Sequence, residues 1–157
     1  MERVYTTVDK SEWGPGEWQD EPDKVQWKDE RSGLACLVKR GPVGAWCGYV
    51  GVAPDHPAFE KDYDDVDVEV HGGLTYAAAC QHGPEESSIC HIPDPGEPDN
   101  VWWFGFDCAH LHDLAPAMAA RDRERGWAAF DVEEYRDVDY ARRETSHLAE
   151  QLADLAA

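Results

Sequence analysis

The chain changes its hydrophobic periodicity once, and this change constrains the fold more than any other feature. Short apolar runs of strand length occupy residues 34–106, whereas the clearest three- and four-residue spacing of apolar positions comes near the end of the chain. A run of strands followed by helices is typical of α+β proteins rather than of alternating βαβ units. The sequence therefore predicts a mainly antiparallel sheet with a C-terminal helix packed on one face.

Several segments predict the strands of this sheet. Leu34–Val38 and Trp46–Val52 flank the turn residues of Gly41–Gly44, so they predict an antiparallel hairpin. Val101–Phe106 is the most apolar segment and predicts a central strand. Asp65–Val70 alternates an acid with valine, which predicts a half-buried strand with its valines inward. A further extended segment is expected over residues 74–79.

The last third of the chain predicts two helices. Leu114–Arg125 has a helical pattern, with Pro116 tolerated in the first turn. Asp137 is expected to cap a longer helix, because apolar residues recur after it at helical spacing up to Leu155. We therefore expect one domain over residues 1–157, divided into an irregular segment (1–33), a mainly stranded part (34–107) and a mainly helical part (114–157).

Composition supports a folded domain outside membranes. Seven Trp, six Tyr and four Phe provide large areas to bury, which outweighs a net charge of −19 as an argument about disorder. No apolar run approaches the roughly 18 residues of a membrane span, and no secretory signal is recognised. A cytoplasmic location, in a bacterium or a phage-infected host, is expected. Thiols stay reduced there, so the five cysteines are not expected to form disulfides.

The charge is distributed unevenly along the chain. Residues 62–120 contain no Lys or Arg but hold twelve acids and five of the seven His. Such an acidic field repels nucleic-acid phosphates and attracts cations or basic partners. Direct sequence-specific binding to nucleic acid is therefore disfavoured, whereas mimicry of nucleic acid toward a basic protein partner is not.

Polar residues that follow two of the apolar segments form the candidate site. The apolar segment Val101–Phe106 is followed directly by Asp107, and loops at strand ends often carry functional side chains. His71 precedes two glycines that let the backbone approach a ligand closely. The catalytic candidates are His71, Asp107 and His110, and the ligand-binding candidates are Gly72, Gly73, Thr75, Trp103 and Asp113.

Three interpretations of this site stay open. His71, Asp107, His110 and Asp113 could ligate a divalent metal that activates water. Alternatively, the two imidazoles could act as acid and base on a phosphoester or glycosidic bond. In a purely structural interpretation, His110 and Asp107 cap a turn after the strand.

A second cluster offers weaker metal candidates. Cys80, His82, Cys90 and His91 combine zinc-ligating residue types, but their spacing matches no standard zinc finger. Cys108 is a conceivable nucleophile, yet its acidic surroundings would raise the pKa of its thiol.

The motifs around these residues resemble a family of uncharacterised proteins from actinobacteria and tailed phages. The resemblance covers roughly residues 35–155 and depends chiefly on Val70–Tyr76 and Trp102–His110. It transfers no catalytic residue, but it implies a phage or prophage setting.

The sequence thus leads to two functional hypotheses. The first is a His/Asp ligand site that hydrolyses a phosphate-bearing or nucleotide-like small molecule, with a divalent metal as an optional cofactor. The second is a binding protein without chemistry, which sequesters a nucleotide signal or presents its acidic face to a host-defence protein. Arg121, Arg123 and Arg125 are close enough in sequence to offset the acidic charge around an anionic ligand.

Overall fold

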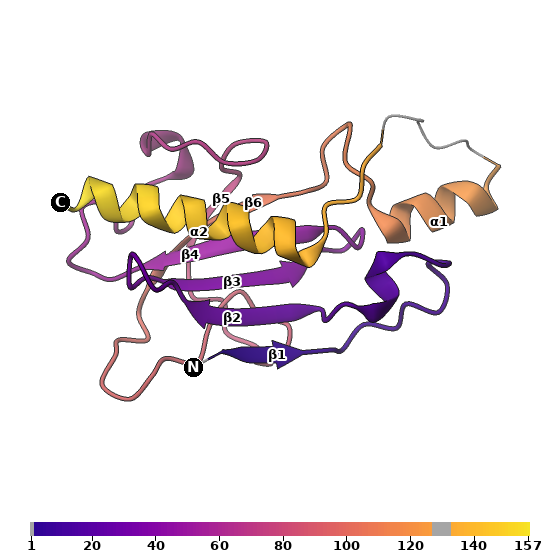
Figure 1. Ribbon diagram of the computed structural model, residues 1–157. Helices are drawn as coiled ribbons and strands as arrows, with labels where there is room; N and C mark the ends of the chain where they lie inside the picture. The colour runs from indigo at the N-terminus through magenta and orange to yellow at the C-terminus, as the bar shows by residue number, and fades with distance from the viewer. Residues whose placement is uncertain (1, 127–132) are drawn as a thin grey trace.

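The computed structural model describes residues 2–126 and 133–157, which form one six-stranded antiparallel sheet and two α-helices (Figure 1). Residues 127–132, within the part predicted to be mainly helical, lie outside the described residues. The elements are β1 (Arg3–Tyr5), β2 (Lys24–Lys28), β3 (Ala35–Arg40), β4 (Trp46–Val52), β5 (Tyr76–Ala79), β6 (Trp102–Asp107), α1 (Pro116–Glu124) and α2 (Val138–Leu155), with short 3₁₀ helices at Glu17–Asp20 and Tyr63–Asp65. The predicted α+β fold class is confirmed.

The strands are ordered β1-β2-β3-β4-β6-β5, and every neighbouring pair is antiparallel. β3 and β4 form the predicted hairpin. β6 lies between β4 and β5, so the most apolar strand has partners on both sides, as expected. His71–Thr75 precede β5, and His110 and Asp113 follow β6, so the candidate site residues flank two strands that are neighbours in the sheet.

α2 covers one face of the sheet (Figure 1). Asp137 caps it as predicted, since its Oδ1 accepts a hydrogen bond of 2.8 Å from the backbone N–H of Tyr140. Leu148 and Leu152 are fully buried and pack on the same cluster as Val50 and Phe104. The predicted shorter helix is also present as α1, with Pro116 at its start.

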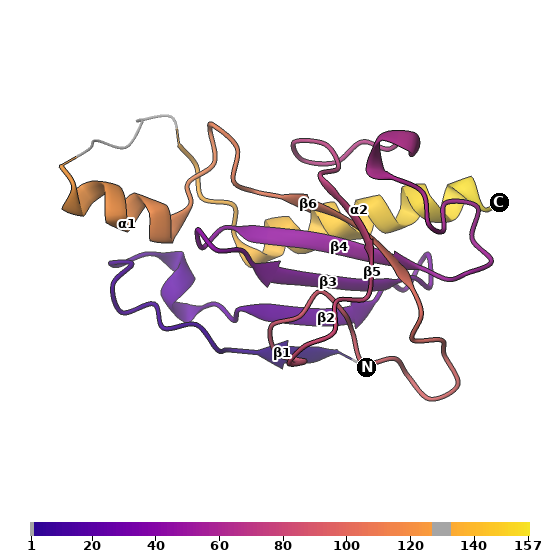
Figure 2. The same cartoon turned by 180° about the vertical axis from the view of Figure 1, so that it is seen from behind.

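The connection between β5 and β6 (residues 80–101) crosses the opposite face of the sheet (Figure 2). Lys24, which is 1 % exposed, donates to the backbone carbonyls of Glu85, Ser88 and Cys90 at 2.5, 2.8 and 2.9 Å. The side-chain amide of Gln26 exchanges two hydrogen bonds of 3.0 Å with the backbone of Ile92. These sheet residues fasten the connection in place.

The prediction that all thiols are reduced is wrong for one pair. Cys80 and Cys90 form a disulfide, because the end of β5 and the returning connection bring their Cα atoms to 4.9 Å, within the range that a disulfide spans. Cys36, Cys47 and Cys108 are free thiols.

The predicted strand at Asp65–Val70 is also wrong. Its valines face the core and its acids face solvent, as the alternation indicates. However, its backbone pairs with helix side chains instead of a strand: Gln151 bonds both the N–H and the carbonyl of Glu69 at 2.7 Å. Alternation reports which side is buried, and it does not report what satisfies the backbone.

The N-terminal segment is more regular than expected. Residues 1–33 were predicted to be irregular, but they contain β1 and β2, which extend the sheet beyond β3. Lys24 and Gln26 interrupt the apolar pattern of β2 because they anchor the β5–β6 connection. Among the described residues, no helix is long and apolar enough to cross a membrane.

Candidate functional site

The structure brings together most of the candidate site residues near the end of β6. The turn after residue 70 places His71 beside the loop that follows Asp107, and the ring centroids of His71 and His110 are 5.8 Å apart. The first turns of α2 complete the group with Tyr140. Three segments that are distant in sequence therefore contribute to one cluster.

His71 is the centre of this cluster, and the protein uses both of its ring nitrogens. Nε2 lies 2.8 Å from Oδ2 of Asp113, and Nδ1 lies 2.6 Å from the hydroxyl of Tyr140. With Nε2–H donating to the carboxylate, the Nδ1 of a neutral ring accepts from Tyr140. Burial and the nearby Glu144 carboxylate raise the pKa of Tyr140, so its hydroxyl keeps the proton that it donates.

Asp113 is the buried acceptor of the cluster. Its side chain is 2 % exposed, and it accepts from His71, from the backbone N–H of His110 at 3.1 Å and from Nε of Arg136 at 3.1 Å. Burial alone would raise the pKa of Asp113, but these hydrogen bonds outweigh it and lower the pKa. Arg136 also contacts Glu134 at 3.1 Å, so its charge is shared between two carboxylates.

His110 is the more accessible imidazole. Its side chain is 38 % exposed, and its Nε2 lies 3.5 Å from Oδ1 of Asp107 without forming a hydrogen bond. Asp107 in turn accepts the hydroxyl of Thr75 at 3.1 Å. The ring of His110 lies over Gly72, where a Cβ atom would come within 2.0 Å of Nε2, so this glycine is required by close approach as well as by its φ of 67°.

Gly73 also has a positive φ, of 80°, but open space surrounds the position of its missing Cβ. Trp103 does not belong to the site, although it was a ligand-binding candidate. It is fully buried on the opposite face of the sheet, because successive strand residues alternate faces, and it packs with Leu37 and Tyr49.

The geometry does not fit the predicted metal sites. Across residues 2–126 and 133–157, no three His, Cys, Asp or Glu side chains are grouped so that they could hold a metal ion. The ring nitrogens of His71 and the carboxylate oxygens of Asp113 are engaged in internal hydrogen bonds. In the second cluster, Cys80 and Cys90 are oxidised to a disulfide and cannot act as thiolates.

Cys108 does not fit the role of a nucleophile. It is 1 % exposed, and burial together with the neighbouring Asp113 raises the pKa of its thiol. A buried thiol whose pKa is raised in this way is inert.

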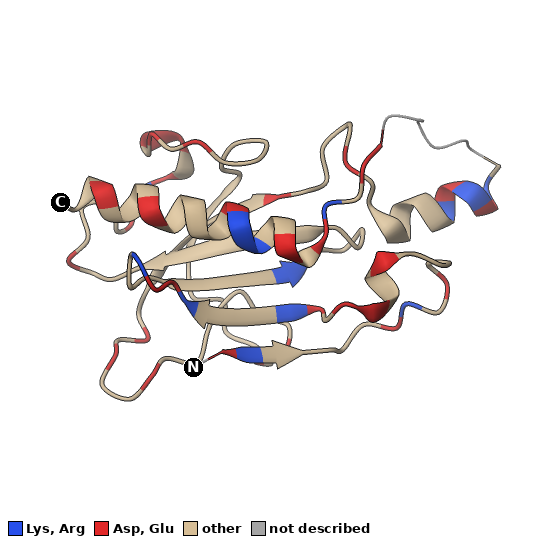
Figure 3. Ribbon diagram, in the orientation of Figure 1, with Lys and Arg blue, Asp and Glu red and all other residues tan. Residues whose placement is uncertain are grey.

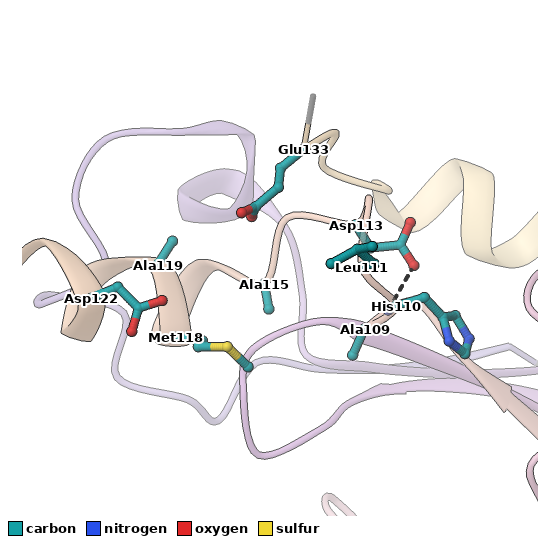
Figure 4. A pocket seen from close by; sticks show the side chains of 9 residues that line it. All are labelled: Ala109, His110, Leu111, Asp113, Ala115, Met118, Ala119, Asp122 and Glu133. Carbon is teal, nitrogen blue, oxygen red and sulfur yellow. Dashed lines mark hydrogen bonds between the residues drawn. The ribbon is translucent and has the colours of Figure 1, made fainter. Parts of the chain in front are cut away.

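A cavity of about 240 Å³ lies beside the cluster, between the loop after β6 and α1 (Figure 4). In this view the ring of His110 turns away from α1, whereas Asp122 lies on the α1 side. Leu111 and Met118 are 71 % and 41 % exposed. The lining residues are Ala109, His110, Leu111, Asp113, Ala115, Met118, Ala119, Asp122 and Glu133. This wall combines carboxylates with exposed apolar side chains, and none of the described residues that line it is Lys or Arg.

Sequence reasoning missed the residues that hold His71 in place. Tyr140 and Glu144 lie four positions apart on α2, which places them on one face of the helix. Tyr140 bonds the ring of His71, and Glu144 accepts its backbone N–H at 2.9 Å. The four-residue spacing of these two polar residues on the predicted helix was the sequence signal that could have identified them.

Comparisons of the chain with protein-family models, with curated proteins and with solved structures gave no match. The resemblance to the actinobacterial and phage family therefore stays a prediction.

Proposed function

We propose that this chain is a binding protein that takes a basic protein partner at the cavity between α1 and the loop after β6. The cavity itself carries this proposal. Three of its lining side chains are carboxylates, from Asp113, Asp122 and Glu133, and Leu111 and Met118 add exposed apolar surface. A Lys or Arg side chain complements this lining, because it joins an apolar stem to a positively charged head.

The distribution of charge supports a basic partner. Lys10, Lys24 and Arg40 are at most 7 % exposed, and they spend their charge on internal acceptors such as Asp23 and backbone carbonyls. Figure 3 shows acidic residues on α2, on both ends of the sheet and along the loops. Asp23, Asp29 and Asp113 are buried as well, so burial leaves the strongly negative balance of the surface unchanged.

Arg121 and Arg123 do not turn this cavity into an anion site. Arg123 donates to the carbonyl of Trp13 at 3.2 Å, and Arg121 lines a different cavity with Asp9 and Glu124. Arg136 is engaged by Asp113 and Glu134. A phosphate-bearing ligand would meet the carboxylates of Asp122 and Glu133, and no Lys or Arg is among the described residues that line the cavity.

The test uses a fluorescent octa-arginine peptide as the probe and measures its anisotropy on binding. Binding by the unaltered chain should weaken steeply as salt rises. The double variant Asp122→Asn/Glu133→Gln should lose most of the affinity. The control Glu85→Gln/Glu86→Gln removes the same charge from the β5–β6 connection and should lose little. Equal losses from the two variants would show general attraction to an acidic surface and would refute the cavity as the site.

A second candidate function is acid–base hydrolysis at His110, which its partial exposure and its contact with Asp107 favour. A carboxylate near a partly exposed imidazole can support general-base catalysis by that ring. Hydrolysis of bis(4-nitrophenyl) phosphate should then disappear in His110→Ala and persist in His112→Ala, which alters an exposed histidine two residues further on. Absence of hydrolysis in the unaltered chain would remove this candidate for phosphodiesters.

The setting is part of the proposal. A host-defence protein of a phage-infected cell is the partner that the family resemblance implies, in the cytoplasm of that cell. The Cys80–Cys90 disulfide opposes a reducing cytoplasm. Alkylation of free thiols at the moment of cell lysis, followed by mass spectrometry, decides the matter: labelled Cys80 and Cys90 support the cytoplasm, and protected ones exclude it.

A further inference from the structure

A second and larger cavity, of about 470 Å³, lies where β5 ends and β6 begins. Its size falls within the range of small-molecule sites. One wall consists of the rings of Phe59 and Trp102, which meet edge to face with centroids 6.3 Å apart. The Cys80–Cys90 disulfide forms part of another wall. This cavity is separate from the one beside His110 and shares no lining residue with it.

The walls are fixed before any ligand arrives. The indole N–H of Trp102 donates to the carbonyl of Lys61 at 2.9 Å, which sets the orientation of the ring. On the other side, Lys24 bonds the carbonyl of Cys90, and Gln26 bonds the backbone of Ile92. A preformed wall reduces the entropy that binding must overcome.

The charged carboxylates that line the cavity have one sign, and the Lys24 ammonium lies behind the wall on the carbonyl of Cys90. Glu60 and Asp99 line it, and no Lys or Arg is among its lining residues within the part of the chain described. His91 adds no opposing charge at neutral pH, because burial lowers the pKa of this ring. Its Nδ1 is buried without a hydrogen-bond partner among the described residues, so an imidazolium would bury an unpaired N–H there.

Aromatic faces beside carboxylates attract organic cations, since the ring quadrupole and the negative charges act in the same direction. We propose that this cavity binds a small organic cation, an ammonium group that carries methyl groups or a compact apolar body. Trp102 provides the aromatic face, and Glu60 and Asp99 provide the charge. The proposal does not depend on the function proposed for the other cavity.

The experiment compares two probes of nearly the same shape on the unaltered, disulfide-bonded chain. Choline carries a trimethylammonium group, and 3,3-dimethylbutan-1-ol is its uncharged carbon isostere. In ¹H–¹⁵N spectra, choline should shift the Trp102 indole and the amides of Ala79 and Ile92, and it should bind about tenfold more tightly than the alcohol, the effect of a cation–π contact with partial desolvation. Sodium chloride at equal concentration provides the blank.

Two variants separate the aromatic face from the charge. Trp102→Leu keeps an apolar wall, and Asp99→Asn keeps the shape, so each should bring choline down to the affinity of the alcohol. Glu86→Gln, in the same connection but outside the lining, should bind choline like the unaltered chain. Thermal unfolding identifies any variant that has lost its fold.

Three results would overturn the proposal on the unaltered chain alone. Equal affinity for choline and the alcohol would show an apolar cavity without preference for charge. Shifts that map to another surface would show binding elsewhere. No shift with choline at about 10 mM would mean that the dissociation constant lies above the millimolar range, which is too weak for a built site.

Discussion

The two faces of the sheet are covered in different ways, and the difference shows what each cover requires. α2 covers its face with apolar side chains such as Leu148, Ala149 and Leu152, which are fully buried. A helix satisfies its own backbone hydrogen bonds, so the sheet beneath it needs to supply only apolar contacts. The helix-covered face is accordingly rich in Val, Phe and Trp.

The β5–β6 connection cannot satisfy its own backbone in this way. Its carbonyls at residues 85, 88 and 90 accept from a buried lysine of β2, and its backbone at residue 92 pairs with a glutamine of the same strand. The disulfide adds a covalent closure. A connection without regular secondary structure therefore depends on hydrogen-bond donors from the sheet that it covers. A charged residue within a strand indicates such a donor.

The largest effect is expected on the helix-covered face. Leu148→Ala should lower the free energy of unfolding by about 2–5 kcal/mol, because it leaves a cavity in the main cluster. Leu155→Ala makes the same change at a side chain that is 45 % exposed and should cost less than about 0.5 kcal/mol. Urea unfolding measures both, and equal costs would contradict the packing described.

The disulfide gives the next largest effect, on the other face. Replacing Cys80 and Cys90 by Ser should lower the free energy of unfolding by roughly 3 kcal/mol, the loop-closure value for cysteines about ten residues apart. Reduction of the unaltered chain should give the same shift. If a reductant leaves the thermal midpoint unchanged, the pair does not close the connection in solution.

The helix-covered face was largely predictable from sequence, and the other face was not. Continuous apolar runs predicted the β3–β4 hairpin and β6, which are buried on both faces, and apolar periodicity predicted α2, which is buried on one side. β2 was missed because Lys24 and Gln26 normally indicate exposed positions, whereas here they are buried anchors. A disulfide depends on where two loops meet, and spacing in the sequence does not report that.

The clustering of the candidate site residues was predictable, but their contacts were not. Ionisable residues after β6 and before β5 do meet, because antiparallel neighbours bring those ends together. The partner of His71 on α2 depends on how the helix lies across the sheet, which single-sequence patterns do not give. His71 was a catalytic candidate, but Tyr140 and Asp113 together engage both of its ring nitrogens.

Asp113 holds His71, the backbone of His110 and Arg136 together through hydrogen bonds. Its contribution to the free energy of unfolding should therefore depend on pH. Its folded pKa lies below the ordinary value of 3.8, so its stabilisation is complete above that value and is lost as the pH falls through the folded pKa. Asp113→Asn should cost about 2 kcal/mol near neutrality and progressively less in acid. Urea unfolding along a pH series measures this, with Asp99→Asn, an exposed carboxyl, as the control. A constant difference down to about pH 2 would contradict the assignment.

The smallest effect tests the anchoring of the connection itself. Lys24→Met keeps the length of the side chain but removes three donors, leaving the carbonyls of Glu85, Ser88 and Cys90 without their partner. Because residues 85–87 are exposed, water can replace part of the loss, so we expect a global cost of only about 1–2 kcal/mol. The diagnostic result is local: amide exchange should accelerate in the connection and stay unchanged in α2. Lys39→Met, on the neighbouring strand, removes a donor to the carbonyl of Arg40 and should leave exchange in the connection unaltered. If Lys24→Met instead destabilised both faces equally, the connection would be an inseparable part of the core rather than a cover held by polar anchors.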